Sequence, residues 1–419
     1  MKTTICSAFA LLAALPLLGA STVTAVSVAE TGNPFKVKVN YTLTGDPAIV
    51  TFEVRTNGVP VKGICRHAVG DVNHLVQPGD RTIVWANDLD WPGHLIAEPS
   101  VKVVVKAWAK DDPPDYAIFD LAKRGFAPMF YESAEDIPGD ITDDAYKTDW
   151  LVLRRIHAAG KTFQLGALQG DTGYKAVWGA HTVTLSKDFY IGVYPITKRQ
   201  YELADPRNTI ATAVGDPTSP YLTETDVYVA TRPAIKVQPK YYVVGSGLEW
   251  PATKGEVQDN LLLGCLRAVT GIGTIYLPTR AQWEIAARAG TVSLFANGSN
   301  TDLDEMGWYA GNNADDPRWT ADLPHAVGLK KPNAWGLYDM HGNVAEYCVD
   351  RSGTPETNAD GSPVVDPAGP STGNHLWIGG SYSDTYEKCA AFSYSEVSDW
   401  GGGDFNHGFR VVCDVEVLK

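Results

Sequence analysis

The chain has 419 residues, 44% of them hydrophobic, so its length and composition allow about two domains with ordinary buried cores. Its 35 basic and 49 acidic residues give a formal net charge of −14. This balance argues against nucleic acid or an anionic membrane surface as the main partner, because both are bound through basic patches. An acidic surface suits a soluble protein and is compatible with the binding of cations.

Residues 1–25 have the pattern of a secretory signal peptide. Lys2 supplies a positive charge, residues 8–18 are apolar, and Val23-Thr24-Ala25 offers small residues for cleavage. The apolar run is too short for a membrane anchor, and no later segment is long and apolar enough to span a bilayer. We therefore expect a protein that is secreted, periplasmic or on the cell surface. The alternative interpretation of this run is a buried N-terminal helix.

Removal of the leader takes away Cys6 and leaves five cysteines. Export permits disulfides. Because five is odd, at least one thiol stays unpaired or pairs with another molecule, and the sequence leaves the pairing open.

Residues 26–110 are expected to form an all-β domain. Apolar and polar residues alternate between 35 and 43, as in a half-buried strand. Asn57-Gly58 is a strong turn signal. Further strands are predicted at 48–54, 81–85 and 101–108. This pattern resembles the architecture of immunoglobulin-like modules, and the simplest role for such a domain is a spacer or a docking surface.

Asp111-Asp112-Pro113-Pro114 interrupts the strand pattern, so we interpret residues 111–150 as a linker. In residues 151–419, glycine and aromatic residues become frequent while regular periodicity becomes rare, which indicates a loop-rich α+β fold. Two capping boxes predict short helices, one starting at Thr197 and the other at Thr279.

Six sequence blocks follow one another in this C-terminal part. They are FQLG at 163–166, FYIGVYPIT at 189–197, LPTRAQWE at 277–284, NAWGLYDMHGNVAE at 333–346, GGSY at 379–382 and GFR at 408–410. Their order and spacing resemble the formylglycine-generating enzyme (sulfatase-modifying factor) family over residues 151–419. The resemblance implies a C-type-lectin-like α+β fold with little regular secondary structure.

The resemblance does not by itself define a function, because one fold can carry several activities. The family includes copper-dependent oxidases that convert a sulfatase cysteine into formylglycine. Related domains occur in iron-dependent sulfoxide synthases, and others are binding proteins.

The oxidase activity implies two cysteines soon after the Gly-Gly-Ser block, because Cu(I) is held by soft thiolates. Here Ser381 ends that block, Asp384 stands at the first cysteine position and Cys389 at the second. One carboxylate and one thiolate make a poor Cu(I) site, so copper binding is not expected. The alternative for Cys389 is a structural thiol, or half of a disulfide with Cys413 or Cys348.

The family's calcium motif is matched better by this sequence than its cysteine motif is. Asp339, Gly342, Val344 and Glu346 match the family's calcium motif, in which two side-chain oxygens flank two backbone carbonyls. Hard cations prefer such oxygen ligands, so a structural calcium ion is expected. The alternative is a solvated Gly-Asn turn with two exposed acids.

Two functions compete. The first is an exported binding module whose pocket takes a sugar or peptide, because aromatic and carboxylate side chains suit such ligands. The pocket residues expected are Asp384, Tyr386, Tyr394, Trp400 and Phe405. The second is a metal-dependent oxidoreductase of the family's type, oxidising a protein cysteine or another thiol through Cys389.

Overall fold

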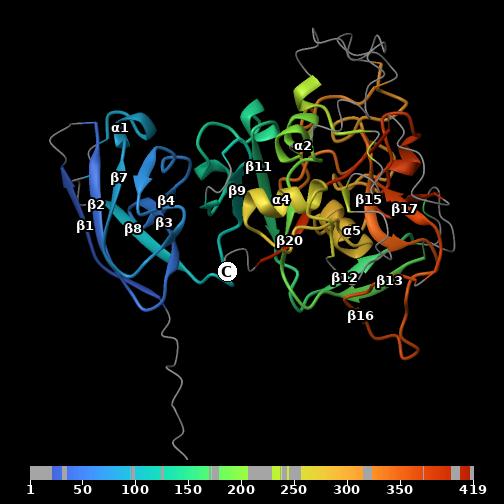
Figure 1. The fold of residues 1–419 in the computed structure, drawn as a ribbon, viewed down its shortest axis with the longest axis horizontal. Coiled ribbons are helices and arrows are strands. Elements are labelled where there is room, and N and C mark those ends of the chain that lie inside the picture. Colours follow the sequence, from blue (N-terminus) through green and yellow to red (C-terminus); the bar gives the residue numbers. More distant parts are fainter. Residues whose placement is uncertain are drawn as a thin grey trace, which may run out of the picture.

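The computed structural model contains an N-terminal β region and a larger C-terminal domain (Figure 1). Its helices are short, and most of its ordered segments are strands. It describes residues 21–30, 35–94, 96, 100–123, 127–168, 171, 179–205, 229–235, 237, 243–244, 256–314, 323–370, 372–397 and 406–415.

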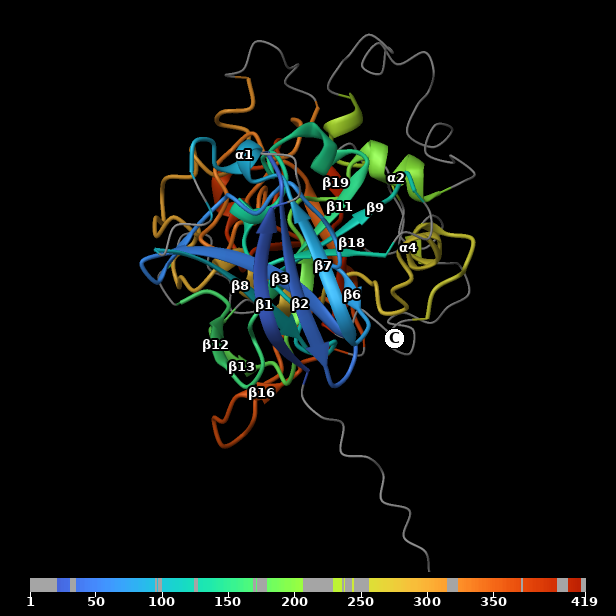
Figure 2. The ribbon, with the colours of Figure 1, turned by 90° about the vertical axis from the view of Figure 1, so that its left-hand side faces the viewer.

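The N-terminal region consists of two antiparallel sheets around one core. Their elements are β1 (Thr22–Glu30), β2 (Val37–Thr44), β3 (Ala48–Thr56), β4 (Val59–Val61), β5 (Ala68–Gly70), β6 (Leu75–Val76), β7 (Gly79–Trp85), β8 (Val101–Trp108) and the helix α1 (Asn87–Asp90). One sheet has the order β1-β2-β7-β5, and the other has the order β4-β3-β6 with β8 paired to β3. Figure 2 shows β1, β2 and β7 in front of the C-terminal domain. The immunoglobulin-like resemblance of this region stays a prediction.

The four predicted strands of this region are confirmed as β2, β3, β7 and β8, and in β2 the predicted alternation follows the burial. Val39, Tyr41 and Leu43 of β2 are buried and face Phe52 of β3 and Trp85 of β7 in a shared core. Asn57 and Gly58 both have positive φ between β3 and β4, as a tight hairpin turn requires.

The first strand overlaps the predicted leader. β1 begins at Thr22 and pairs with β2, with Thr22 opposite Thr44 and Val23 opposite Leu43. Cleavage after Ala25 would therefore remove the beginning of this strand, whereas a mature chain that begins at Ser21 keeps it whole.

The stretch 111–150 is not a simple linker, because it supplies two strands of the central sheet of the C-terminal domain. β9 (Tyr116–Asp120) and β10 (Met129–Tyr131) join β11 (Trp150–Ile156), β14 (Phe189–Gly192) and β20 (Val412–Asp414) in the order β10-β9-β11-β14-β20. The first four residues of β9 are buried, so this strand has packing on both faces and lacks the alternation of a half-exposed strand. Two 3₁₀ helices follow, η1 (Ala134–Asp136) and η2 (Asp144–Lys147).

The rest of the C-terminal domain is built from small sheets and short helices. One sheet has the order β12-β13-β16, and another has the order β18-β17-β15-β19. Their strands are β12 (Thr162–Leu165), β13 (His181–Thr184), β15 (Ala345–Arg351), β16 (Val364–Val365), β17 (His375–Ile378), β18 (Tyr394–Val397) and β19 (His407–Gly408). The helices are α2 (Lys198–Ala204), α4 (Leu262–Thr270) and α5 (Arg280–Arg288), with 3₁₀ turns η4 (Val229–Thr231) and η6 (Tyr386–Cys389). Among the described residues, no helix has the length and apolar character needed to cross a bilayer.

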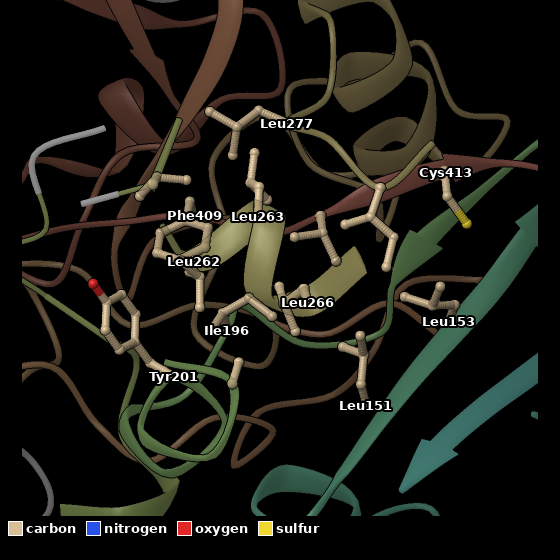
Figure 3. Packing of buried hydrophobic residues seen from close by; sticks show 14 of the residues in the cluster. Leu151, Leu153, Ile196, Tyr201, Leu262, Leu263, Leu266, Leu277, Phe409 and Cys413 are labelled. Atoms are coloured by element: carbon tan, nitrogen blue, oxygen red, sulfur yellow. The ribbon is translucent and has the colours of Figure 1, made fainter. Parts of the chain in front are cut away.

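Both predicted capping boxes are present. Thr197 Oγ1 accepts the Gln200 backbone N–H, and Thr279 Oγ1 accepts that of Gln282. Each glutamine side chain in turn accepts the N–H of its threonine. These caps start α2 and α5, and α4 packs its leucines against β11 and the segment around Phe409 in the main core (Figure 3).

The N-terminal region and the C-terminal domain are joined by direct contacts. Ile49 of β3 belongs to the same buried cluster as Phe119 and Phe130. Thr51 Oγ1 donates to Glu132 Oε1 at 2.6 Å, and Lys106 Nζ lies 2.5 Å from Glu132 Oε2. The two regions therefore share packing and are not two bodies joined by an open tether.

Candidate functional site

A tight turn after β17 positions the family's cysteine region. Gly379 and Gly380 both have positive φ, at 88° and 63°. A Cβ on Gly380 would lie 2.7 Å from Cys389 Sγ, and one on Gly379 would lie 2.7 Å from the Trp283 ring. Only glycine fits these two positions without movement, so the Gly-Gly pair lets the chain close over Cys389.

Asp384 is held by its own neighbours. Ser381 Oγ donates to Asp384 Oδ2 at 2.6 Å, and Lys388 Nζ lies 3.1 Å from Asp384 Oδ1. Ser381 is fully buried, whereas Asp384 is partly exposed and Lys388 is exposed. The first cysteine position of the family thus carries a charged, hydrogen-bonded carboxylate at the surface.

Cys389 ends η6 and is fully buried. Its Sγ lies 3.9 Å from the Ser381 carbonyl oxygen, to which the thiol is a weak donor. Desolvation, together with the nearby Asp384 carboxylate, raises the pKa of the Cys389 thiol well above its usual value. The sulfur is therefore a protonated thiol at neutral pH, whereas metal binding and nucleophilic attack need the thiolate.

The disulfide alternative for Cys389 is wrong in this structure. Cys389, Cys348 and Cys413 are all buried thiols. Cys413 belongs to the core around α4, whereas Cys389 and Cys348 belong to the core beneath β15 and β17.

His341 makes a hydrogen bond to the backbone of Cys389, a contact that the sequence did not indicate. Its Nε2 accepts the Ala296 backbone N–H at 3.2 Å, so the ring proton lies on Nδ1, which donates to the Cys389 carbonyl at 2.9 Å. Burial lowers the pKa of His341 to about 4, so the ring is neutral. Its position inside the block at 333–346 gave no signal of this contact, which joins residues far apart in the chain.

The predicted ligand pocket is brought together only in part. Asp384 and Tyr386 lie on one partly exposed segment, and the Tyr386 ring lies 6.3 Å from that of Phe295. Tyr394 instead is buried, with the Arg280 guanidinium 4.9 Å from its ring centroid. The other two predicted members, Trp400 and Phe405, lie outside the described residues.

Of the four predicted calcium residues, Asp339, Gly342 and Val344 lie on a buried turn, and Glu346 follows in strand β15. Asp339 and Gly342 have positive φ, at 55° and 90°. Asp339 Oδ2 accepts the Gly328 N–H at 2.7 Å, while its Oδ1 has no hydrogen-bond partner among the described residues. Burial raises the pKa of Asp339 to about 6. An unsatisfied, buried carboxylate oxygen is the kind of group that a cation would satisfy.

Glu346 does not fit the predicted role, because Arg410 already holds it. Arg410 Nε and Nη2 donate to the two Glu346 oxygens at 2.7 and 2.8 Å, and Trp283 Nε1 donates to Oε2 at 2.7 Å. Arg410 also donates to the carbonyl oxygens of Gly192 and Tyr338, both at 2.9 Å. In this arrangement a guanidinium, rather than a metal ion, neutralises Glu346. Val344 is buried beside it.

Arg410 thus holds several blocks of the fold together, although the sequence indicated it only as part of the GFR block. Nothing in the sequence indicated this pair, because the burial of Glu346, which calls for a cation, is visible only in the structure.

The comparisons with known proteins agree with this arrangement of blocks. Residues 154–415 match the sulfatase-modifying factor enzyme 1-like domain. The chain therefore belongs to the sulfatase-modifying factor family.

Among its relatives is a protein named chaperone protein LppX from Paenibacillus barcinonensis, which is 31% identical over 196 residues, or 44% of this chain and 69% of the relative. The formylglycine-generating enzyme of Streptomyces coelicolor is 36% identical over 162 residues, or 34% of this chain and 48% of the enzyme. The chain thus spans about half the length of that enzyme.

Among solved structures, Treponema denticola variable protein 1 aligns with a TM-score of 0.45 at 24% identity, covering 63% of this chain and 95% of that protein. PvdO from Pseudomonas aeruginosa aligns with a TM-score of 0.45 at 21% identity, covering 63% and 94%.

Proposed function

We propose that this chain is a ligand-binding member of the sulfatase-modifying factor family, without the family's cysteine-oxidising activity. The observation that supports it best is the state of Asp384, which replaces the first cysteine and is bound by Ser381 and Lys388. A carboxylate with these partners is a hard, already neutralised ligand and competes poorly for Cu(I). The ligand class is a small sugar or peptide, and the leader pattern supports an exported protein.

The competing function is a metal-dependent oxidation through Cys389. Family membership favours it, and the Streptomyces relative is named for that activity. Burial of Cys389 and the raised pKa of its thiol argue against it, since the reactive form is the thiolate. The name of the Paenibacillus relative, a chaperone protein, points towards binding instead.

The test is an oxidation assay on the full chain. The protein is incubated aerobically with Cu(I) and a peptide that carries a sulfatase-type cysteine motif, and mass spectrometry detects the aldehyde. The Streptomyces formylglycine-generating enzyme serves as the positive control. We expect no aldehyde from this protein. Aldehyde formation that is lost in Cys389→Ser would overturn the proposal.

A further inference from the structure

A small cavity opens at the N-terminal end of α5, and none of the residues assigned above to the cysteine region lines it. Its volume is about 30 Å³. By the usual measure this is room for roughly two water-sized groups. The walls come from β12, β13, the start of α5, the end of β15 and the loop 353–370. The polar lining residues are His181, Arg280, Asp350, Arg351 and Glu356.

Arg280 is the least satisfied charged group of this lining. The residue is 9% exposed, yet its Nε and Nη2 have no hydrogen-bond partner among the described residues. Its nearest carboxylate oxygen is Glu284 Oε2 at 3.9 Å, and that oxygen also lacks a hydrogen bond. Buried polar atoms are normally paired, so this donor and acceptor indicate a missing polar group between or beside them.

The other lining groups supply both donors and acceptors. Asp350 is buried and its Oδ2 accepts the Arg280 backbone N–H at 2.6 Å. Burial raises the pKa of Asp350 to about 7, so near neutral pH its carboxyl can donate as well as accept. Burial lowers the pKa of His181, whose Nδ1 lies 2.9 Å from the Gly179 carbonyl oxygen. The neutral ring therefore donates from Nδ1 and offers Nε2 as an acceptor.

Charge and shape together select the ligand class. The lining holds two arginines and two carboxyl groups, of which Asp350 is partly protonated near neutral pH. A cationic ligand is therefore disfavoured, and the lining offers a mixed set of donors and acceptors. A ligand carboxylate would fill the same space but would meet Asp350 and Glu356. Hydroxyl groups are both donors and acceptors, so a pair of them satisfies such a mixed lining. Pro355, Pro367 and Pro370 add apolar surface at the rim.

We propose that this cavity binds two adjacent hydroxyl groups of a neutral, hydroxyl-rich ligand, the arrangement that sugars present. The hydroxyls occupy the inner space beside Arg280 and Asp350, and the rest of the ligand lies outwards, towards the exposed Glu356. This site deepens the binding function proposed above and rests on it.

The experiment is a titration of the full chain with glucose, mannose, galactose and N-acetylglucosamine, followed by ligand-observed NMR at millimolar concentrations. Acetate and inorganic phosphate form the anion arm. The test variants are Arg280→Met and Glu356→Gln. Arg267→Met is the matched control, because Arg267 on α4 is also a partly buried arginine, 6.0 Å from the ring of Tyr276, and it does not line the cavity.

We expect at least one of the sugars to bind, and Arg280→Met to weaken that binding about tenfold or more, as loss of a charged hydrogen-bond partner does. Arg267→Met should bind like the unchanged protein. Arg280 also lies 4.9 Å from the Tyr394 ring centroid and 3.9 Å from Glu284 Oε2, so the binding of each variant is compared below its own melting temperature.

Three results would overturn the inference. The first is no binding of any of the sugars, and the second is binding of acetate or phosphate in their place. The third is sugar binding that survives Arg280→Met but is lost in Asp384→Ala. That third result would move the ligand to the cysteine region and leave the proposed binding function standing.

Discussion

The buried pair of Glu346 and Arg410 should control the stability of the C-terminal domain. Both side chains are fully buried, and each carboxylate oxygen accepts from the guanidinium. Glu346→Gln keeps the shape of the side chain but removes its charge. Arg410→Met keeps much of the volume of the side chain. It leaves the Trp283 indole N–H as the remaining side-chain donor to Glu346, and it removes the donor to the carbonyl oxygens of Gly192 and Tyr338.

Removal of one partner from a buried ion pair costs about 3–5 kcal/mol, because the other charge remains buried alone. For a domain of this size, each kcal/mol lowers the melting temperature by about 2–4 °C, so a fall of about 6–20 °C is expected for each single variant. The double variant has no uncompensated charge, and it should lose less free energy of unfolding than the sum of the two single variants.

The assay is urea unfolding followed by circular dichroism and tryptophan fluorescence, with and without a calcium chelator. If Arg410 is the cation for Glu346, the loss of stability in Glu346→Gln is the same with and without the chelator. A calcium ion bound only by the folded state would instead add about 2.7 kcal/mol at a hundredfold excess over Kd, and chelation would remove it. A loss of less than about 1 kcal/mol in each single variant, as for an exposed ion pair, would contradict a buried pair, as would strict additivity in the double variant.

Three other predictions follow from buried contacts. Gly380→Ala should lower the melting temperature strongly, since a left-handed non-glycine residue costs about 1–3 kcal/mol and the added Cβ would lie 2.7 Å from Cys389 Sγ; an unchanged melting temperature would contradict the packing. Burial raises the pKa of Asp350 to about 7, so its stabilising contribution is complete below the unfolded pKa and is lost as the pH rises through 7. Asp350→Asn should therefore flatten the fall in the urea midpoint between about pH 4 and pH 7, and a fall of the same size in the variant would be evidence against it. Arg155→Met should make the chain near Pro113 easier to cut in limited proteolysis, with Arg199→Met as the exposed control; equal cutting rates would mean that Arg155 does not hold this segment.

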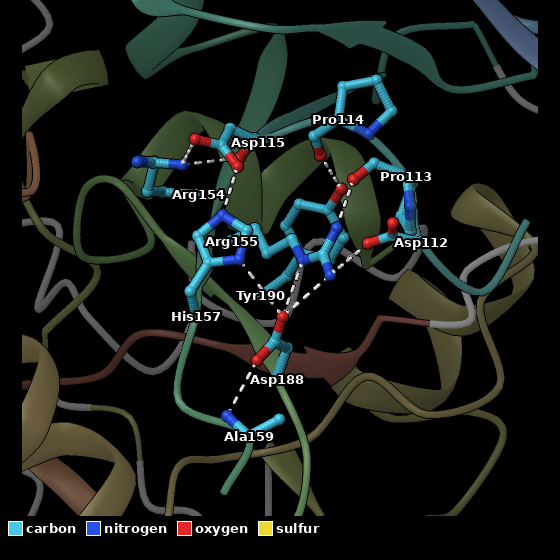
Figure 4. Close-up of polar contacts among 10 residues, drawn as sticks. All are labelled: Asp112, Pro113, Pro114, Asp115, Arg154, Arg155, His157, Ala159, Asp188 and Tyr190. Atoms are coloured by element: carbon cyan, nitrogen blue, oxygen red, sulfur yellow. Dashed lines mark hydrogen bonds and ion pairs between the residues drawn. The ribbon is translucent and has the colours of Figure 1, made fainter. Parts of the chain in front are cut away.

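The last of these predictions concerns a segment that the sequence described wrongly. Paired prolines after two aspartates indicated the start of a linker with short local structure, and this segment is instead fixed by long-range contacts (Figure 4). Arg155 Nη1 donates to the Pro113 carbonyl at 2.6 Å, and the same guanidinium pairs with Asp112 and Asp188. Tyr190 donates its hydroxyl hydrogen to the Pro114 carbonyl. These partners lie up to 76 residues away, so local turn chemistry could not reveal them.

Local signals gave reliable predictions wherever the deciding contacts are local. The helix starts at Thr197 and Thr279 depend on atoms three residues apart, and both were predicted correctly. The alternation in β2 reports a single buried face and was also sufficient. β9 has no such alternation, because its first four residues are buried on both faces of the sheet.

The sequence could place three residues near one another, but it could not predict the chemical state of each. The order of the blocks put Ser381, Asp384 and Cys389 in one region, and in the structure Ser381 contacts both of the others. Their role as a site stays a prediction. The state of each group depends on the surroundings, which no motif records. The buried thiol of Cys389, the neutral His341 beneath it and the guanidinium on Glu346 all arise from contacts between distant blocks.

The common contact of Asp384 and Cys389 with Ser381 leads to a final prediction. Asp384 accepts from the Ser381 hydroxyl, and the Cys389 sulfur lies 3.9 Å from the Ser381 carbonyl oxygen, so both side chains contact one residue. Asp384→Cys should therefore place two sulfur atoms around Ser381 and raise the affinity for Cu(I), which prefers two soft ligands over one. Competition with a chromophoric Cu(I) chelator measures the change, and Asp384→Ser is the control that also removes the carboxylate. The double variant Asp384→Cys/Cys389→Ser should bind Cu(I) no better than the unchanged protein. If Asp384→Cys binds Cu(I) no more tightly than Asp384→Ser, the two positions do not face a common space, and the loss of the cysteine pair is then not what separates this protein from the oxidases of its family.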